Sequence, residues 1–283
     1  MGSRMAANLV RGGFELTVWN RTASTAERFA SEHDVRHAAT PAQAARESEF
    51  VVTMVVDAPQ VEQVLLGRDG AATAARETTL FIDCSTIGPT PTRSLGAALA
   101  DRGLSLLDAP VTGSSPKAQD GTLTIMAGGS QQDFERARPV LDSMGELIVH
   151  AGPLGHGQMV KLINNAVAAC NATVLGQALL VGARAGVDLD ALLAVMRSGS
   201  GGSAMLELKA EPMRRHDYTT LFKLEHMLKD VRLCLEEGQS LGAPFPSAAF
   251  AREILSGAIG LGHADDDFAA LIEVLERLAG TTL

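Results

Sequence analysis

Phe50-Val51-Val52-Thr53-Met54-Val55-Val56 decides the fold class of this chain. A run that is almost entirely apolar is typical of a strand buried on both faces of a sheet. Helical stretches flank it, at residues 42–46 and 58–66. Apolar runs and helices continue to alternate as far as residue 150, which predicts βαβ units and a doubly wound parallel sheet, an α/β fold. The other strands are expected at residues 16–19, near 35, and at 79–83, 105–108, 123–126 and 147–149.

The pattern changes after Gly152-Pro153, where helical periodicity replaces the alternation and no further β-rich run occurs. We therefore expect an α/β domain over residues 1–153 and an all-helical domain over residues 154–283. The stretch 158–185 is the longest helical pattern in the chain, about 28 residues or roughly 42 Å long. Its length indicates a helix that spans both domains or packs against a second subunit.

The composition argues against several classes of protein. A net charge of −9 and an aromatic content of 4% disfavour nucleic-acid binding. The longest apolar run, residues 166–181, is interrupted by polar residues and so predicts a buried helix rather than a membrane span. No metal site is expected, since His33 and His37 have no third ligand nearby. The scattered cysteines indicate reduced thiols and a cytoplasmic location; they are Cys84, Cys170 and Cys234.

Polar residues follow two of the expected strands, at the sheet edge where open α/β folds bind ligands. Asn20-Arg21-Thr22 comes after the strand that ends at Trp19. An acidic residue here would hold a ribose 2′-hydroxyl, whereas Arg21 suits a 2′-phosphate. An exposed arginine after a strand is, however, usually only solvated. Ser85-Thr86 offers hydroxyls and backbone amides at the end of another strand.

Asp108-Ala109-Pro110-Val111-Thr112-Gly113-Ser114-Ser115 follows a further strand and is expected to form a loop. The rigid proline, the hydroxyl group and the small residues would let backbone amides close on an anion such as a carboxylate. A plain Ser/Gly turn explains the same residues equally well. The residues alone therefore leave both interpretations open.

Lys161 and Asn165 lie four residues apart in the long helical stretch, and therefore on one face of that helix. Gly155-His156-Gly157 precedes them at the expected domain junction, a common place for an active site. A lysine beside a reacting carbonyl can donate a proton as a general acid, and Asn165 can hold the substrate. A solvated lysine in the first turns of a helix is the plainer alternative. Lys229-Asp230 is likewise typical of an exposed pair.

Four ordered motifs resemble those of the β-hydroxyacid dehydrogenase family, which includes 3-hydroxyisobutyrate dehydrogenase, tartronate semialdehyde reductase and the glyoxylate/succinic semialdehyde reductases. The resemblance runs the whole length of the chain and implies a Rossmann-type dinucleotide-binding domain followed by an all-helical domain for substrate binding and dimerisation. It also implies an enzyme that transfers hydride between NAD(P) and a small β-hydroxyacid, its semialdehyde or its ketoacid. The motifs are Met1 to Leu9, Asp108 to Gly113 with Gly121-Thr122-Leu123, Gly155 to Asn165, and Phe222 to Asp230.

The resemblance implies roles for individual residues. Lys161 would be the general acid in carbonyl reduction and the base in alcohol oxidation, while Asn165 would position the substrate. Asn20-Arg21-Thr22 resembles the form found in NADPH-preferring members, so NADP(H) is expected, with NAD as the alternative. The implied substrate-binding residues are Thr112, Gly113, Ser114, Asn164, Phe222 and Asp230. The implied cofactor-binding residues are Gly2, Asn20, Arg21, Thr22, Met54, Val55, Thr86 and Lys229.

Two departures from the family pattern leave the substrate open: Thr112 stands where serine is usual, and Ser114 where a second glycine is common. We expect a small carboxylate-bearing substrate and a homo-oligomer, a dimer or tetramer formed through the C-terminal helices. Imine-reductase relatives lack the lysine, so Lys161 argues against that activity. The alternatives are an NAD-linked 3-hydroxyisobutyrate dehydrogenase and a catalytically impaired homologue that acts as a binding protein.

Gly2 is the only glycine present of the family's Gly-rich opening. We expect Met1 to be an internal methionine of a longer natural chain, preceded by roughly ten residues that contain the first strand and the start of the glycine-rich loop. That strand would lie in the middle of the sheet, and its loss would leave unpaired backbone groups that cost on the order of 1–3 kcal/mol each. The expected consequence is weak cofactor binding by the 283-residue form.

Overall fold

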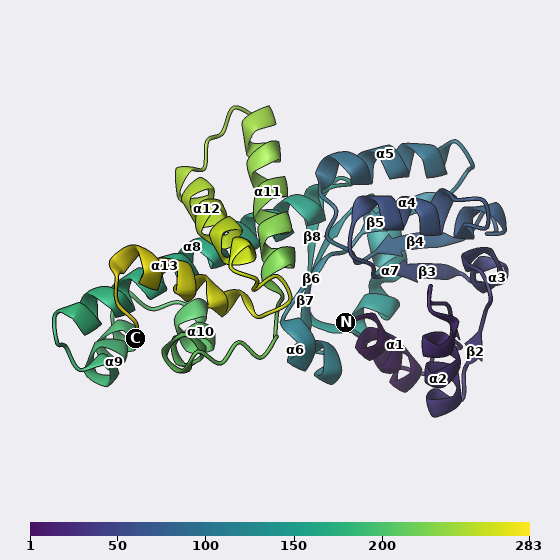
Figure 1. Ribbon diagram of the computed structural model, residues 1–283. Helices are drawn as coiled ribbons and strands as arrows, with labels where there is room; N and C mark the ends of the chain where they lie inside the picture. The colour runs from purple at the N-terminus through teal and green to yellow at the C-terminus, as the bar shows by residue number, and fades with distance from the viewer. The chain divides into compact units, whose positions relative to one another are not determined.

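The computed structural model describes residues 1–283 and divides into two compact units, Met1–Lys161 and Leu162–Leu283 (Figure 1). The first unit contains all the strands, and the second contains only helices. The division falls within one long helix, α8 (His156–Arg184), whose first turns belong to the first unit. The expected α/β fold followed by an all-helical part is confirmed.

A six-stranded sheet forms the centre of the first unit. β3 (Phe50–Thr53), β4 (Leu80–Asp83) and β5 (Ser105–Asp108) are parallel neighbours, paired from their first residues onward. β7 (Leu123–Gly128) runs antiparallel beside β5. Two further strands pair with β7 and complete the sheet: β6 (Val111–Thr112), which is antiparallel to it, and β8 (Gly145–Gly152), which is parallel. The sheet is therefore mixed at this end rather than parallel throughout.

The strand expected at residues 50–56 is shorter and less buried than the sequence predicts. β3 ends at Thr53, and residues 54–56 lie in the segment that follows it. Only Thr53 of this strand is fully buried, because β3 lies at one edge of the six-stranded sheet and pairs with β4 alone. The fully buried strand is β4, whose residues are all shielded from solvent.

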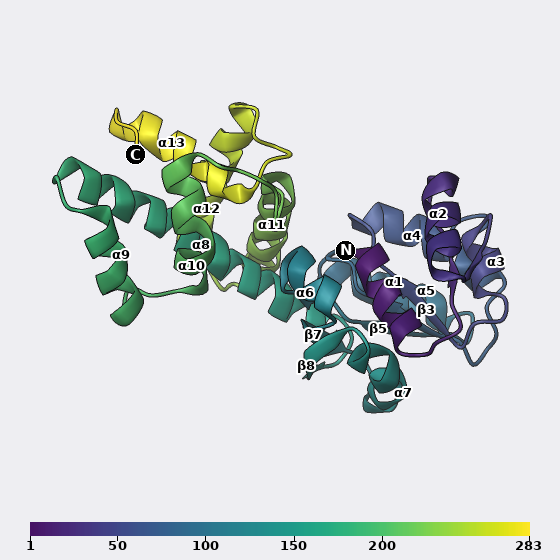
Figure 2. The same cartoon turned by 90° about the horizontal axis from the view of Figure 1, so that it is seen from below.

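Helices cover both faces of this sheet. Their bounds are α1 (Gly2–Arg11), α2 (Ala23–His33), α3 (Pro41–Ala45), α4 (Ala58–Leu66), η1 (Ala71–Thr73), α5 (Pro89–Ala100), α6 (Ser114–Asp120) and α7 (Gln131–Asp142). Successive residues of β4 point to opposite faces, so Leu80 and Ile82 pack with α1, α6 and α7, while Phe81 packs with α3, α4 and α5. Figure 2 shows α7 beside β7 and β8.

β1 (Thr17–Val18) and β2 (Arg36–His37) form a separate, two-stranded parallel sheet. The strand expected at residues 16–19 is thus shorter, and it does not join the six-stranded sheet. Both β1 and β3 consequently have one edge without a neighbouring strand.

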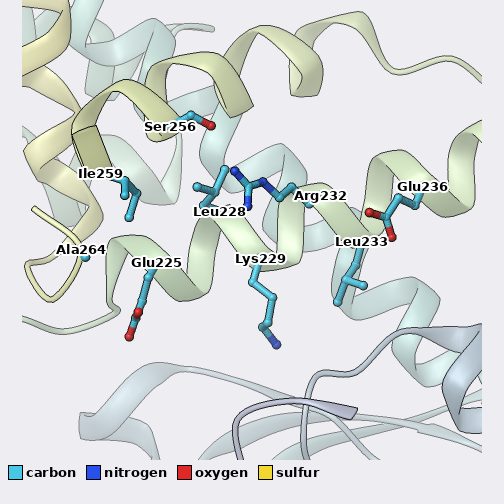
Figure 3. Close-up of a pocket in the computed structure, with 9 residues that line it drawn as sticks. All are labelled: Glu225, Leu228, Lys229, Arg232, Leu233, Glu236, Ser256, Ile259 and Ala264. Carbon is cyan, nitrogen blue, oxygen red and sulfur yellow. The ribbon is translucent and has the colours of Figure 1, made fainter. Parts of the chain in front are cut away.

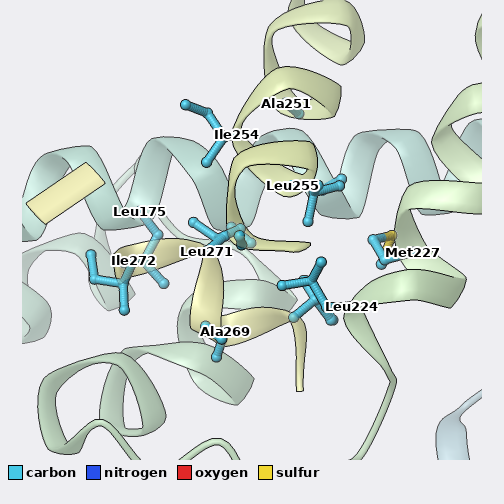
Figure 4. Packing of buried hydrophobic residues seen from close by; sticks show 14 of the residues in the cluster. Leu175, Leu224, Met227, Ala251, Ile254, Leu255, Ala269, Leu271 and Ile272 are labelled. Atoms are coloured by element: carbon cyan, nitrogen blue, oxygen red, sulfur yellow. The ribbon is translucent and has the colours of Figure 1, made fainter. Parts of the chain in front are cut away.

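The second unit is built from helices around one apolar core (Figure 4). Leu175 of α8 lies in this core, together with Leu224, Leu255 and Leu271 from three other segments. By length and composition α8 could cross a membrane, and half of that apolar stretch is buried inside the structure; core helices of globular domains meet the same criterion. The other elements are α9 (Leu189–Ser198), α10 (Ala204–Arg215), α11 (Leu224–Ser240), α12 (Pro246–Gly260), η2 (Phe268–Leu271) and α13 (Ile272–Ala279).

Gly157→Ala is expected to lower the free energy of unfolding by on the order of 3 kcal/mol. A Cβ at this position, in the first turn of α8, would lie 2.2 Å from the carbonyl oxygen of Met126, which is backbone of β7 and cannot move aside alone. Urea denaturation measures the effect. Gly260→Ala in α12 is the matched control, since nothing lies within 4 Å of a Cβ there. Equal stabilities of the two variants would contradict the prediction.

Candidate active site

The carboxylate of Asp108, at the end of β5, caps the N-terminus of α8. Oδ1 accepts a hydrogen bond from the backbone N–H of Gly155 at 2.6 Å, and Oδ2 accepts one from the N–H of Gln158 at 2.7 Å. The N–H of Gln158 lies in the first turn of α8, where backbone donors have no partner within the helix itself, and the N–H of Gly155 lies immediately before that turn. Asp108 therefore fixes the start of the helix that carries Lys161. The sequence does not indicate this role, since Asp108 is expected only as the first residue of a loop.

Asp108 is wholly buried, and this burial raises the pKa of its carboxyl group to about 7. The two backbone N–H groups act in the opposite direction, and the nearby Asp83 carboxylate adds to the increase. Asp83, at the end of β4, is also buried and accepts hydrogen bonds from Thr53 Oγ1 at 2.7 Å and from the N–H of Ser85 at 3.1 Å. Two buried carboxyl groups thus lie at the carboxyl ends of neighbouring strands.

Lys161 and Asn165 are buried on α8, with 6% and 4% of their surfaces exposed. The alternative of a solvated lysine is therefore wrong. Asn165 Nδ2 donates a hydrogen bond to Asp230 Oδ2 on α11 at 2.7 Å, and its Oδ1 accepts one from Asn164 Nδ2 at 3.1 Å. These bonds fix the amide of Asn165, while Asn164 itself is exposed.

Asp230 is almost fully buried, and Lys229 is partly buried beside it. The second carboxylate oxygen of Asp230, Oδ1, lies 3.1 Å from Lys229 Nζ, although it accepts no hydrogen bond of normal geometry. The interpretation of Lys229-Asp230 as an exposed surface pair is thus wrong. Instead, Asp230 is the residue that orients Asn165, a function that the family resemblance did not imply.

A pocket of about 470 Å³ lies on the second unit, between α11 and the end of α12. Figure 3 shows Arg232 turned toward Ser256, whereas Lys229 points away from that residue. Basic and acidic side chains balance in the lining, so the pocket does not by itself specify the charge of a ligand. Its lining residues are Glu225, Leu228, Lys229, Arg232, Leu233, Glu236, Ser256, Ile259 and Ala264.

Two regular elements interrupt the loop expected over residues 108–115, so Thr112 and Ser114 lie in a strand and a helix and only Gly113 lies between them. Thr112 ends β6, where it pairs with Thr124 of β7, and Ser114 begins α6. The turn between them needs positive φ angles, of +129° at Gly113 and +57° at Ser114. A side chain at Gly113 would also meet Lys117 Cβ at 2.7 Å. The turn is therefore specific in shape, because only glycine adopts such a φ without strain.

Three of the segments expected to bind the cofactor meet at the carboxyl ends of β3 and β4. Gly2, the first residue of α1, lies against Met54, since a Cβ at Gly2 would be 3.6 Å from Met54 Cβ. The N–H of Val55 donates a hydrogen bond to Ser85 Oγ at 2.9 Å, which joins this segment to the one that contains Thr86. Ser85, expected only to offer a hydroxyl at this edge of the sheet, thus links the two segments.

Asn20, Arg21 and Thr22 connect β1 to α2, and all three are exposed. Asn20 Oδ1 accepts a hydrogen bond from the N–H of Thr22 at 2.9 Å, which forms a tight turn immediately before the helix. The exposed guanidinium of Arg21 sits in this turn.

Phe222 is held by a buried ion pair that the sequence did not reveal. Lys209 Nζ on α10 lies 2.7 Å from Asp267 Oδ1, and both side chains are only 3% exposed. Asp267 Oδ2 accepts hydrogen bonds from the N–H groups of Leu221 and Phe222, at 3.1 and 3.0 Å. Asp267 also caps η2, since its Oδ1 accepts a hydrogen bond from the N–H of Ala269 at the start of that element. Burial lowers the pKa of Lys209.

Comparisons with known proteins match both parts of the chain. The family model for the NAD binding domain of 6-phosphogluconate dehydrogenase matches residues 1–152. The model for the NAD-binding domain of NADP-dependent 3-hydroxyisobutyrate dehydrogenase matches residues 155–275. An uncharacterised oxidoreductase of Synechocystis is 38% identical, over 96% of this chain and 93% of its own.

Two further relatives carry names that specify a substrate. The NAD-dependent L-serine dehydrogenase of Pseudomonas aeruginosa is 33% identical, over 99% of this chain and 96% of its own. The solved structure of Mycobacterium tuberculosis 3-hydroxyisobutyrate dehydrogenase with L-serine is 32% identical, with a TM-score of 0.89 over 97% of this chain and 95% of that one.

The free energy of unfolding is expected to lose a contribution from Asp108 as the pH rises. Because the pKa of this group is raised from 3.8 to about 7 in the folded state, the folded protein keeps a proton that the unfolded chain loses between those values. The contribution is thus fully present below about pH 4 and is lost by about pH 7. The measurement is the free energy of unfolding of the wild type minus that of Asp108→Asn, which should fall across this range. A difference that rises would mean that the N–H groups of Gly155 and Gln158 hold the pKa below its usual value.

Proposed function

The chain belongs to the β-hydroxyacid dehydrogenase family of NAD(P)-dependent oxidoreductases, and we propose that Lys161 is its general acid and base. In this proposal the enzyme interconverts a small β-hydroxyacid and its semialdehyde or ketoacid, with NADP(H) as the preferred cofactor. The observation that carries the proposal is the burial of Lys161 and Asn165 on one face of α8, with Asn165 held by Asp230.

A nicotinamide cofactor, when bound, supplies or accepts the hydride at the substrate carbon. The residues that would hold it fit a dinucleotide. α1 begins at Gly2 and has no acidic residue in its first turn, so a phosphate there meets the positive end of the helix dipole. The exposed Arg21 suits a 2′-phosphate, which supports NADP(H).

The protein's own chemistry is then the movement of one proton. During reduction the substrate oxygen gains negative charge as hydride reaches the carbon, and the ammonium of Lys161 donates a proton to that oxygen. During oxidation the neutral amine accepts the proton from the hydroxyl group. Asn165 holds the same oxygen through its amide, whose orientation Asp230 maintains. Removal of water around Lys161 strengthens these interactions, because a buried site has a low effective dielectric constant.

The substrate carboxylate is assigned to the turn between β6 and α6. The hydroxyl of Thr112 and the backbone N–H of Gly113 offer donors to an anion, and the fixed φ angles of Gly113 and Ser114 set their direction. A small hydroxyacid is also what the relatives named for L-serine and 3-hydroxyisobutyrate act on.

A second copy of this chain is the proposed partner of α8. Apolar residues recur at intervals of seven along this helix, at Val160, Val167, Val174 and Val181, and each is more than two-fifths exposed. Two copies of such a stripe can pack together as in a left-handed coiled coil.

The cytoplasm is the proposed location of the protein. The free cysteines are consistent with a reducing compartment.

Lys161→Ala is expected to lower kcat by about 10²–10⁴-fold, because it removes the proton donor. Turnover is followed by NADPH absorbance with a panel of small semialdehydes and hydroxyacids. Arg138→Ala, which removes an exposed cation on α7, is the control and should leave kcat unchanged. Unchanged turnover in Lys161→Ala would overturn the proposed mechanism. A strong preference for NADH over NADPH would overturn the proposed binding of a 2′-phosphate by Arg21. It would favour an NAD-linked 3-hydroxyisobutyrate dehydrogenase. Absence of turnover with every substrate would favour a binding protein.

Val174→Glu is expected to convert the oligomer into monomers, because it places a charge in the middle of the apolar stripe on α8. Size-exclusion chromatography with light scattering measures the mass. Val195→Glu is the matched control, since Val195 is equally exposed on α9 but lies off the stripe. An unchanged mass of the Val174→Glu oligomer would contradict the proposed interface.

A further inference from the structure

Gln158 is a wholly buried amide in the first turn of α8, three residues before Lys161. Its side chain makes three hydrogen bonds to the segment that follows β4. Nε2 donates to the carbonyl oxygen of Ser85 at 2.8 Å, and Oε1 accepts from the N–H groups of Ile87 and Gly88 at 2.9 and 3.1 Å. One side chain thereby satisfies three backbone groups of another segment.

The segment 85–88 needs such a support because it lies between β4 and α5 and has no regular secondary structure. Ser85, Ile87 and Gly88 are all buried, so their polar backbone groups would be costly if they were unpaired. Thr86, the residue assigned to the cofactor, lies in the middle of this segment. The hydrogen bonds of Gln158 to Ser85 on one side and to Ile87 and Gly88 on the other therefore set the position of Thr86.

The same helical turn is held from a second direction. The backbone N–H of Gln158 donates to Asp108 at the end of β5, while its side chain binds the segment after β4. Since α8 is continuous from His156, fixing this turn also fixes the backbone and Cβ of Lys161, which lies less than one turn further on.

We propose that Gln158 is a positioning residue for the reaction, which sets the distance between Lys161 and the segment that carries Thr86. The inference rests on the proposed function of Lys161. It states that Gln158 touches neither the substrate nor the cofactor, and that it acts through the geometry of these two groups. A shift of about 1 Å between a catalytic group and its reactant can cost a factor of about 100 in rate.

The test compares two substitutions of similar length. Gln158→Met fills the same space but makes none of the three hydrogen bonds. Gln158→Glu keeps the acceptor for Ile87 and Gly88, and when protonated it can also donate to the carbonyl oxygen of Ser85. When ionised, it instead presents negative charge to that carbonyl. The charged groups near this position include Asp108 on β5, Asp83 on β4, Lys161 on α8 and Arg93 on α5, whose Nη1 would lie 3.2 Å from a Cβ at Gly155. The two carboxyl groups favour the protonated form of Glu at position 158, and the two cations favour the ionised form.

The expected result is a fall in kcat of about 100-fold for Gln158→Met, with a much smaller change in the KM for the hydroxyacid. The kcat of Gln158→Glu relative to wild type should recover as the pH falls, whereas that of Gln158→Met should not. Thr79→Val is the matched control for lost stability. Thr79 is a buried residue immediately before the start of β4, the end of the strand that lies away from the segment 85–88. Its Oγ1 donates a hydrogen bond to the carbonyl oxygen of Ser48 at 2.8 Å. This variant should lose stability without losing kcat.

The outcomes separate this inference from the proposed function. If Lys161→Ala abolishes turnover while Gln158→Met stays within about threefold of wild type, the positioning role is wrong and the role of Lys161 stands. If Lys161→Ala keeps wild-type turnover, both are wrong, because there is no catalytic lysine to position. If Gln158→Met does not fold, the pH dependence of kcat in Gln158→Glu is the test of the positioning role. If the ratio of kcat in Gln158→Glu to kcat in the wild type does not change with pH, the inference is overturned.

Discussion

The cap that Asp108 provides for α8 is the interaction on which the candidate active site depends. It ties the carboxyl end of β5 to the helix that carries Lys161 and Asn165, through N–H groups that the helix cannot satisfy itself. Glycines make this close approach possible. A side chain at Gly128 would lie 2.4 Å from Asp108 Oδ1, and one at Gly157 would lie 2.7 Å from Oδ2. The cost is a buried carboxyl group whose pKa is raised to about 7.

Much of the fold could be predicted because the local signals agree with the tertiary structure. The helix expected at residues 58–66 has those bounds as α4, since Asp57 caps it and Gly67 follows its end. The signals fail where pairing between distant strands decides the outcome. β6 is two residues long and exists only because β7 lies beside it, so no local run could indicate it. Likewise, the apolar residues of β3 resemble a central strand, although its position in the sheet is at an edge.

The candidate site likewise contains residues that local sequence signals indicate and contacts that only the tertiary structure brings together. Lys161 and Asn165 could be named from their helical spacing and from the family motifs, because both signals are local in sequence. The contacts that orient the site could not be predicted. Asp230 meets Asn165 across 65 residues of chain, and Lys209 meets Asp267 across 58. Nothing in the sequence around either partner indicates the other. For the same reason, the residues around Lys161 left a solvated lysine open as an alternative, and Lys229-Asp230 resembled an exposed pair, although Lys161 and Asp230 are buried.

The chemistry of the groups that hold α8 follows from the charges already buried there. Asp83 and Asp108 place two carboxyl groups at the ends of neighbouring strands, and ionised carboxyl groups there raise the cost of a further negative charge nearby. A neutral amide at Gln158 can both donate and accept, so it satisfies the carbonyl of Ser85 and the N–H groups of Ile87 and Gly88 without adding a charge. A charged side chain of similar length would satisfy only one kind of partner. It would also change the electrostatic field at Lys161, the proposed proton donor. A neutral amide, which pairs with both the carbonyl and the N–H groups, therefore suits this position better than a charged side chain.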